Sequence, residues 1–187
     1  IWQRDPRAWG ADAGSADERS IRTRLGWLDV PETMSDGVPR AADLAQQISA
    51  EQFDAVYLLG MGGSSLCAEV LRLVCGVAPG HPELFVLDTT DERTIATAAA
   101  RLDPARTLFV VASKSGGTVE VASLERFFWA RMVEAEGSAA GRHFIAITDP
   151  GTALQALAES KHYREVFVNP ADIGGRFSAL SLFGLVP

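Results

Sequence analysis

From Phe53 onward, the chain alternates between short apolar runs and longer segments with helical periodicity. The five apolar runs cover residues 55–59, 84–87, 107–112, 143–148 and 165–168. They are mainly continuous instead of alternating with polar residues, which is typical of strands buried on both faces. Such strands joined by helices form a parallel sheet with right-handed crossovers. The sequence therefore predicts the α/β class, as a three-layer α/β/α sandwich around a five-stranded parallel sheet.

Helical periodicity separates the strands at about 65–76, 91–102, 118–137 and 151–160. The first fifty residues differ, because they hold three of the 4 tryptophans and many charges. Two further helices are predicted there, over 15–28 and 39–49, but their apolar residues are too few for a separate core. We therefore expect an N-terminal helical segment or linker at 1–50 and the sandwich at 51–187.

Composition excludes several classes of protein. The chain has 187 residues, is 47% hydrophobic and has a net charge of -7, so it is neither disordered nor suited to general binding of nucleic acid or anionic membranes. No apolar run approaches the roughly 18 to 20 residues that span a bilayer. Cys67 and Cys75 lie about 12 Å apart on one predicted helix, too far for a disulfide. Two buried, reduced thiols would suit a cytoplasmic protein.

Two turns after strands consist of glycine and hydroxyl residues, at 60–65 (Gly-Met-Gly-Gly-Ser-Ser) and 113–118 (Ser-Lys-Ser-Gly-Gly-Thr). Glycine lets a ligand approach the backbone, and the helix that follows presents free amides with a partial positive charge. Hydroxyl groups add donors, and Lys114 adds a full charge. These features predict a phosphate-monoester site at the carboxyl ends of the strands. Both turns can contact one ligand most readily in strand order 2-1-3-4-5, because strands 1 and 3 are then neighbours. In order 3-2-1-4-5, strand 2 would separate the turns.

Two other interpretations stay open at this point. Glycine and serine also form ordinary turns and helix caps. Gly60-x-Gly62 after a strand, with Asp88 at the end of the next strand, partly fits a dinucleotide site, but Ser65 occupies the third glycine position. The sequence has no glycine–lysine–Ser/Thr run, which excludes a P-loop. The three histidines have no ligand pattern around them, so we expect no metal. The phosphate-monoester interpretation, unlike the dinucleotide one, also implies no cofactor.

A third cluster, Gly174-Gly175-Arg176-Phe177-Ser178, follows the last strand. An arginine alone is more often an ordinary surface residue. The three clusters together, in this order, resemble the sugar isomerase (SIS) domain of glucose-6-phosphate isomerases, and the resemblance covers about 53–187. The run from Gly174 to Pro187 is similar to the signature around the catalytic arginine of that family.

The resemblance implies an aldose–ketose isomerase that interconverts glucose 6-phosphate and fructose 6-phosphate through an enediolate. By position, Arg176 would stabilise the charge of the enediolate, because a fixed cation aimed at developing charge lowers the barrier. Gly175 would supply a backbone contact. The phosphate would be bound by hydroxyl groups and nearby backbone: Ser64, Ser113, Ser115 and Thr118, with Gly62 and Gly63 giving room and the backbone near Lys114 helping.

In this family the glutamate base and the ring-opening histidine belong to a second, C-terminal SIS half of the same polypeptide. We therefore expect residues 1–187 to bind sugar phosphate weakly without turning it over. Glu120 and Glu125 are expected to be solvated helix residues and not the base. The alternative from another functional class is a non-catalytic sugar-phosphate sensor.

Residues 1–5 and 24–29 are similar to the segment that joins the halves of bacterial bifunctional transaldolase/phosphoglucose isomerases. An attached transaldolase domain and a homodimer are therefore further expectations.

Overall fold

The computed structural model describes residues 1–187 and contains one five-stranded sheet in the order β2-β1-β3-β4-β5. Every neighbouring pair is parallel. The strands lie within one residue of the predicted runs: β1 (Ala55–Gly60), β2 (Glu83–Leu87), β3 (Thr107–Ala112), β4 (Phe144–Thr148) and β5 (Glu165–Val168). The predicted α/β class and the strand order 2-1-3-4-5 are confirmed.

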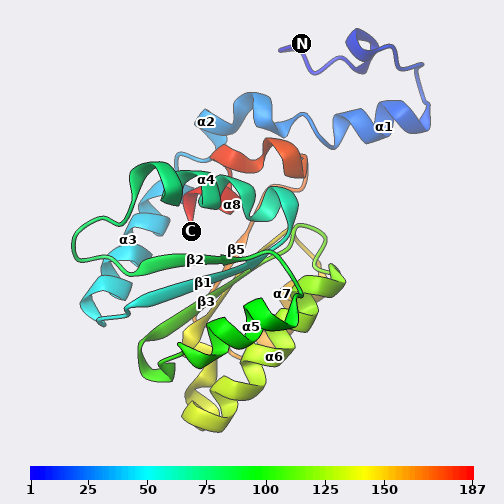
Figure 1. Cartoon of the computed structure of the whole chain (residues 1–187). Helices are drawn as coiled ribbons and strands as arrows, with labels where there is room; N and C mark the ends of the chain where they lie inside the picture. The colour runs from blue at the N-terminus through cyan, green and yellow to red at the C-terminus, as the bar shows by residue number, and fades with distance from the viewer.

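Helices cover both faces of the sheet, as Figure 1 shows. One face carries α5 (Glu92–Ala100), α6 (Val119–Glu136) and α7 (Ala153–Ser160). The opposite face carries α3 (Gly37–Ala50), α4 (Leu66–Cys75) and α8 (Leu182–Leu185). Four of these helices, α4, α5, α6 and α7, match the segments predicted between strands. Helices on both faces of one sheet make the three layers of the predicted sandwich.

Successive side chains of strand β3 point to opposite faces of the sheet and so contribute to two separate hydrophobic clusters. Leu108 and Val110 point into the cluster under α3, whereas Phe109 and Val111 point into the cluster under α6. None of these four side chains is more than 2% exposed. Each buried side chain of this size stabilises the fold by about 1.5–3 kcal/mol, so the central strands are held firmly from both sides. The loops at their carboxyl ends therefore start from a rigid edge.

The N-terminal segment is only partly helical. It contains α1 (Ala16–Arg22), α2 (Val30–Thr33) and two 3₁₀ turns, Pro6–Trp9 and Gly26–Asp29. Helix α1 buries no residue and lies apart from the sheet in Figure 1. The single helix predicted over 15–28 is wrong beyond Arg22, because Leu25 leaves the helical path to form an antiparallel bridge with Ile173.

Residues after this bridge join the body of the domain. Val30 and Met34 belong to the same hydrophobic cluster as Leu44 and Ile48 of α3 and the side chains on that face of the sheet. The division of the chain at residue 50 stays a prediction.

Helix α4 turns its apolar face to the outside. Leu66, Val70, Leu73 and Val74, which share that face, are 64%, 50%, 67% and 78% exposed. Cys67 is half-buried and Cys75 is exposed, and both thiols are free, so the expectation of two buried thiols is wrong. None of the helices combines the length and the hydropathy that a membrane crossing requires.

Candidate ligand site

The two glycine- and hydroxyl-rich turns leave neighbouring strands at the same edge of the sheet. Strands β1 and β3 are paired with Gly60 opposite Ala112, so the turns begin side by side. The next strand continues this edge, because the amide of Asp149, directly after β4, donates to the carbonyl oxygen of Lys114 at 3.3 Å. The sheet therefore brings these loops together, as the sequence predicts.

The turn over 113–118 forms a cradle of donors at the start of α6. The hydroxyl oxygens of Ser113 and Thr118 lie 3.0 Å apart, and the amide of Gly117 donates to Ser115 Oγ at 3.3 Å. The amides of Ser115 and Thr118 have no acceptor within the protein. Helix α6 has 18 residues and directs its partial positive charge to this point. Free amides, hydroxyl groups and a helix N-terminus together suit a phosphate dianion.

Glycine is required at position 116 of this turn. Gly116 has a φ of +65°, and a Cβ there would overlap the side chain of Thr152. The hydroxyl of Thr152 is fixed in turn, 2.7 Å from that of Thr148 at the end of β4. The cradle is therefore shaped by the neighbouring strand as well as by its own residues.

Lys114 points away from the cradle. Its ammonium group pairs with Asp149 and donates to the carbonyl oxygen of Ala171 at 2.9 Å. Burial raises the pKa of Asp149, and the Lys114 ammonium opposes that rise. The lysine thus ties the cradle to the loop after β5, and its charge is largely compensated before any ligand arrives.

The first turn and the loop that carries Arg176 touch through their backbones. A Cβ added at Gly63 would overlap the carbonyl oxygen of Gly175. The buried hydroxyl of Ser178 lies 2.9 Å from the carbonyl oxygen of Gly63 and 2.7 Å from that of Gly175, and it shares its one proton between them. No role for Ser178 is predicted from the sequence, although the residue stands two places after Arg176. It holds the two loops in register.

A cavity of about 570 Å³ opens where these loops meet, within the volume range usual for small-molecule sites. Its lining contains no acidic residue and no histidine: Thr23, Arg24, Gly63, Lys114, Ala171, Gly174, Gly175, Arg176 and Phe177.

Nine site residues were predicted from the sequence, and four of them, Gly63, Lys114, Gly175 and Arg176, line this cavity. Three others, Ser113, Ser115 and Thr118, form the cradle, next to Lys114 in the chain. The last two, Gly62 and Ser64, flank Gly63 in its 3₁₀ turn and do not line the cavity. The structure thus places the predicted residues in one region, and their roles stay predictions.

The two glutamates of α6 lie outside this cavity, and one of them is not solvated. Glu120 is exposed, but Glu125 is only 4% exposed. Its Oε1 accepts from Lys161 Nζ and from the Tyr163 hydroxyl, each at 2.7 Å. The expectation that Glu125 is a solvated helix residue is therefore wrong. Burial and the neighbouring carboxylate raise the pKa of Tyr163, so the phenol stays protonated and donates.

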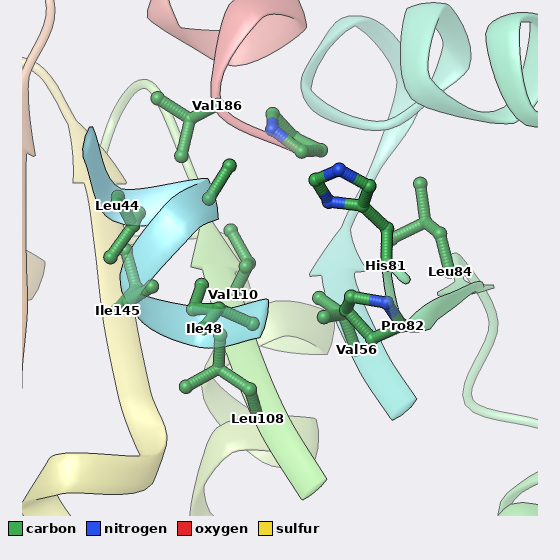
Figure 2. A pocket seen from close by; sticks show the side chains of 12 residues that line it. Leu44, Ile48, Val56, His81, Pro82, Leu84, Leu108, Val110, Ile145 and Val186 are labelled. Atoms are coloured by element: carbon green, nitrogen blue, oxygen red, sulfur yellow. The ribbon is translucent and has the colours of Figure 1, made fainter. Parts of the chain in front are cut away.

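A second cavity, of about 120 Å³, lies on the α3 face of the sheet. Figure 2 shows Leu44 and Ile48 of α3 on the left and His81, Pro82 and Val56 on the right. His81 is its one ionisable lining residue, and Nδ1 of that ring lies 3.2 Å from Ser49 Oγ. This apolar space offers no donors comparable to the cradle, so it does not suit a dianion.

Comparison with known proteins identifies the family of the chain. The family model of "Phosphoglucose isomerase" matches residues 42–187. The chain belongs to the phosphoglucose isomerase family. A glucose-6-phosphate isomerase of Campylobacter jejuni is 33% identical over 168 residues, which cover 87% of this chain and 39% of that protein. The chain therefore spans less than half the length of this relative.

Solved structures also match this phosphoglucose isomerase family member. A glucose-6-phosphate isomerase of Chlamydia trachomatis has a TM-score of 0.72 and 28% identity, over 98% of this chain and 33% of that one. A hypothetical protein of Thermus thermophilus has a TM-score of 0.79 and 30% identity, over 100% of this chain and 42% of that one.

Proposed function

We propose that this chain is the sugar-phosphate-binding part of a glucose-6-phosphate isomerase, which interconverts glucose 6-phosphate and fructose 6-phosphate. The observation that carries the proposal is one cavity without any acidic lining residue, lined by Lys114 of the 113–118 turn and by the loop that carries Arg176. A donor cradle at a helix N-terminus suits a phosphate, and a guanidinium beside it suits the charge of an enediolate. Family membership supports both assignments.

In the proposed mechanism Ser113, Ser115 and Thr118 hold the phosphate through hydroxyl groups and free amides. Arg176, which makes no ion pair within the chain, stabilises the enediolate as the proton moves between C2 and C1. No glutamate, aspartate or histidine lines the cavity, so the acid–base groups must come from elsewhere in the complete enzyme. The 187-residue chain accordingly binds substrate without turning it over.

The sensor alternative fits less well. A sensor needs only affinity, whereas Arg176 lies at the cavity with its donors unused, as a group that stabilises developing charge requires. Attachment of a transaldolase domain rests solely on residues 1–5 and 24–29, and the mass of the natural gene product tests it. The proposed partner within the enzyme is the C-terminal SIS half of the polypeptide.

The binding function is tested by calorimetry on the 187-residue chain with fructose 6-phosphate, 6-phosphogluconate and NAD. The double change Ser115→Ala with Thr118→Ala removes two hydroxyl donors, and each lost hydrogen bond to a charged group costs about 1.5–3 kcal/mol. We expect both sugar phosphates to bind and the double variant to lose at least tenfold in affinity.

The matched control is Ser123→Ala, one turn into α6, where the hydroxyl donates only to the carbonyl oxygen of Val119 at 2.8 Å. The affinity of Ser123→Ala for both sugar phosphates should equal that of the unchanged chain. Binding of NAD alone, or equal losses in the control and the double variant, would reject the proposed function.

A further inference from the structure

The N-terminal segment is fixed against the loop that carries Arg176. Leu25 and Ile173 form an antiparallel bridge, and the amide of Gly26 donates to the carbonyl oxygen of Asp172 at 2.8 Å. A side chain at position 26 would overlap the carboxylate of Asp172, so the two segments are in van der Waals contact here. The backbone on the N-terminal side of Leu25 is thereby held beside the Arg176 loop.

Two side-chain contacts add to this attachment. Trp27 stacks on Phe177 with ring centroids 5.3 Å apart. Arg4 pairs with Asp29 and, at 3.0 Å, with Asp172, which links three parts of the chain. These contacts define where the residues before Leu25 lie relative to the cavity.

Arg24 is placed by this packing at the wall of the cavity. A Cβ added at Gly174 would lie 3.6 Å from the Cβ of Arg24, so the stem of the arginine runs along that glycine. Thr23 and Arg24 line the cavity together with Arg176. Residue 24 lies outside the range 42–187 that the family model matches.

The electrostatics of the cavity leave this arginine available to a ligand. Neither Arg24 nor Arg176 makes an ion pair or a side-chain hydrogen bond, whereas Lys114 is already paired with Asp149. Two guanidinium groups with unused donors thus line a cavity that has no acidic lining residue. Such an arrangement favours an anionic group, because charge-assisted hydrogen bonds are about twice as strong as neutral ones.

The position of the cavity indicates which end of the ligand Arg24 would meet. The cradle hydroxyls do not line it, but Lys114, which belongs to the same 113–118 turn, does line it, with its ammonium group turned toward Asp149 and Ala171. A ligand whose phosphate lies on the cradle therefore extends its sugar into the cavity, toward the two arginines.

We propose that Arg24 is a further substrate-binding residue, which contacts the C1–C2 end of a bound sugar phosphate beside Arg176. The inference rests on the proposed function of the site. Arg24 then favours ligands that carry negative charge at that end, such as an aldonic acid 6-phosphate or the enediolate of the reaction. It also makes the N-terminal segment a part of the binding site instead of a mere connection.

The test is calorimetric affinity of the 187-residue chain for three probes: 6-phosphogluconate, with a carboxylate at C1; sorbitol 6-phosphate, without one; and inorganic phosphate. We expect Arg24→Ala to weaken 6-phosphogluconate by about tenfold and the other two by less than about threefold. Arg24→Lys should recover most of the loss. Arg22→Ala is the matched control, because Arg22 pairs with Glu18 at 2.9 Å on the exposed side of α1 and does not line the cavity.

The other outcomes separate a failure of the Arg24 assignment from a failure of the proposed function. Unchanged affinity of Arg24→Ala for 6-phosphogluconate, or equal losses for all three probes, would overturn the assignment of Arg24 while the proposed function stands. If the unchanged chain bound none of the three probes, the proposed function itself would fail. Thermal unfolding of each variant, followed by circular dichroism, shows that the compared chains are folded.

Discussion

The two facing glycines of the site differ in how closely their neighbours approach. A methyl group at Gly63 would overlap the carbonyl oxygen of Gly175, whereas one at Gly175 would meet no atom within 4 Å. We expect Gly63→Ala to lower the free energy of unfolding by about 1–3 kcal/mol, the usual range for overpacking. Gly175→Ala should change it by less than about 0.5 kcal/mol. Urea denaturation measures both, and equal costs would contradict the close contact.

His143 gives the fold a pH dependence that can be isolated. Its side chain is 0% exposed; Nδ1 lies 2.9 Å from the Thr107 carbonyl oxygen, and Nε2 accepts from Arg142 at 3.1 Å. Burial lowers the pKa of this imidazole below its ordinary value. Below about pH 6.5 the unfolded chain gains a proton at this histidine that the folded chain does not. The free energy of unfolding therefore decreases as the pH is lowered.

We therefore expect the free energy of unfolding to decrease from about pH 7 to about pH 5 with a contribution from His143 of at most about 1.4 kcal/mol per pH unit. His143→Gln has no titrating group at this position and should show a shallower decrease in parallel urea titrations. The same slope in both proteins would show that His143 does not carry the effect.

Residue roles could be predicted from the sequence where the partners are local. The hydroxyls of Ser113 and Thr118 lie five residues apart in one turn, and their pattern indicated a cradle directly. The pairing of Lys114 with Asp149 joins residues 35 apart, and Ser178 bonds to Gly63 across 115 residues. Contacts of that kind depend on which strands are neighbours, and no local pattern contains that information.

At the scale of elements, the stack of Trp27 on Phe177 should hold the Arg176 loop in place. Trp27 is half-buried, and truncation removes both its packing and the aromatic contact. We expect Trp27→Ala to lower the free energy of unfolding by about 2 kcal/mol and to speed hydrogen exchange over residues 174–178 about tenfold. Exchange mass spectrometry measures this. Trp2→Ala is the control, because Trp2 is 75% exposed and stacks on no other ring.

Strands were predicted within one residue because continuous apolar runs between glycine- and proline-rich turns have few alternatives. Helix α4 shows the limit of such patterns. Periodicity indicated which residues share a face, but not whether that face meets the sheet. In the structure the small Ala68, 3% exposed, packs into the core, and the larger aliphatic residues point outward. Orientation is set by the loops on either side, which the periodicity of the helix does not include.

At the scale of the whole molecule, one property of parallel sheets accounts for the site. Because all five strands run the same way, the loops after β1, β3, β4 and β5 gather at one edge. That convergence was predictable once the strand order was chosen. The contribution of the N-terminal segment was not, because its attachment through Leu25 and Ile173 is a single bridge between residues far apart in the sequence.

The exposed face of α4 predicts how the isolated chain behaves in solution. Leu66, Val70, Leu73 and Val74 form an apolar strip, each at least 50% exposed, and contiguous strips of this kind promote association. We expect the 187-residue chain to self-associate with rising concentration in light scattering coupled to size exclusion. The double change Leu73→Lys with Val74→Gln should keep it monomeric and alter the free energy of unfolding by less than about 0.5 kcal/mol.

Val133→Lys is the matched control for this prediction, because Val133 is 41% exposed on α6, across the sheet from α4. It adds the same charge without touching the strip, so its association should follow that of the unchanged chain. If the control and the double variant both became monomeric, net charge would be the cause. If neither did, another surface would hold the copies together.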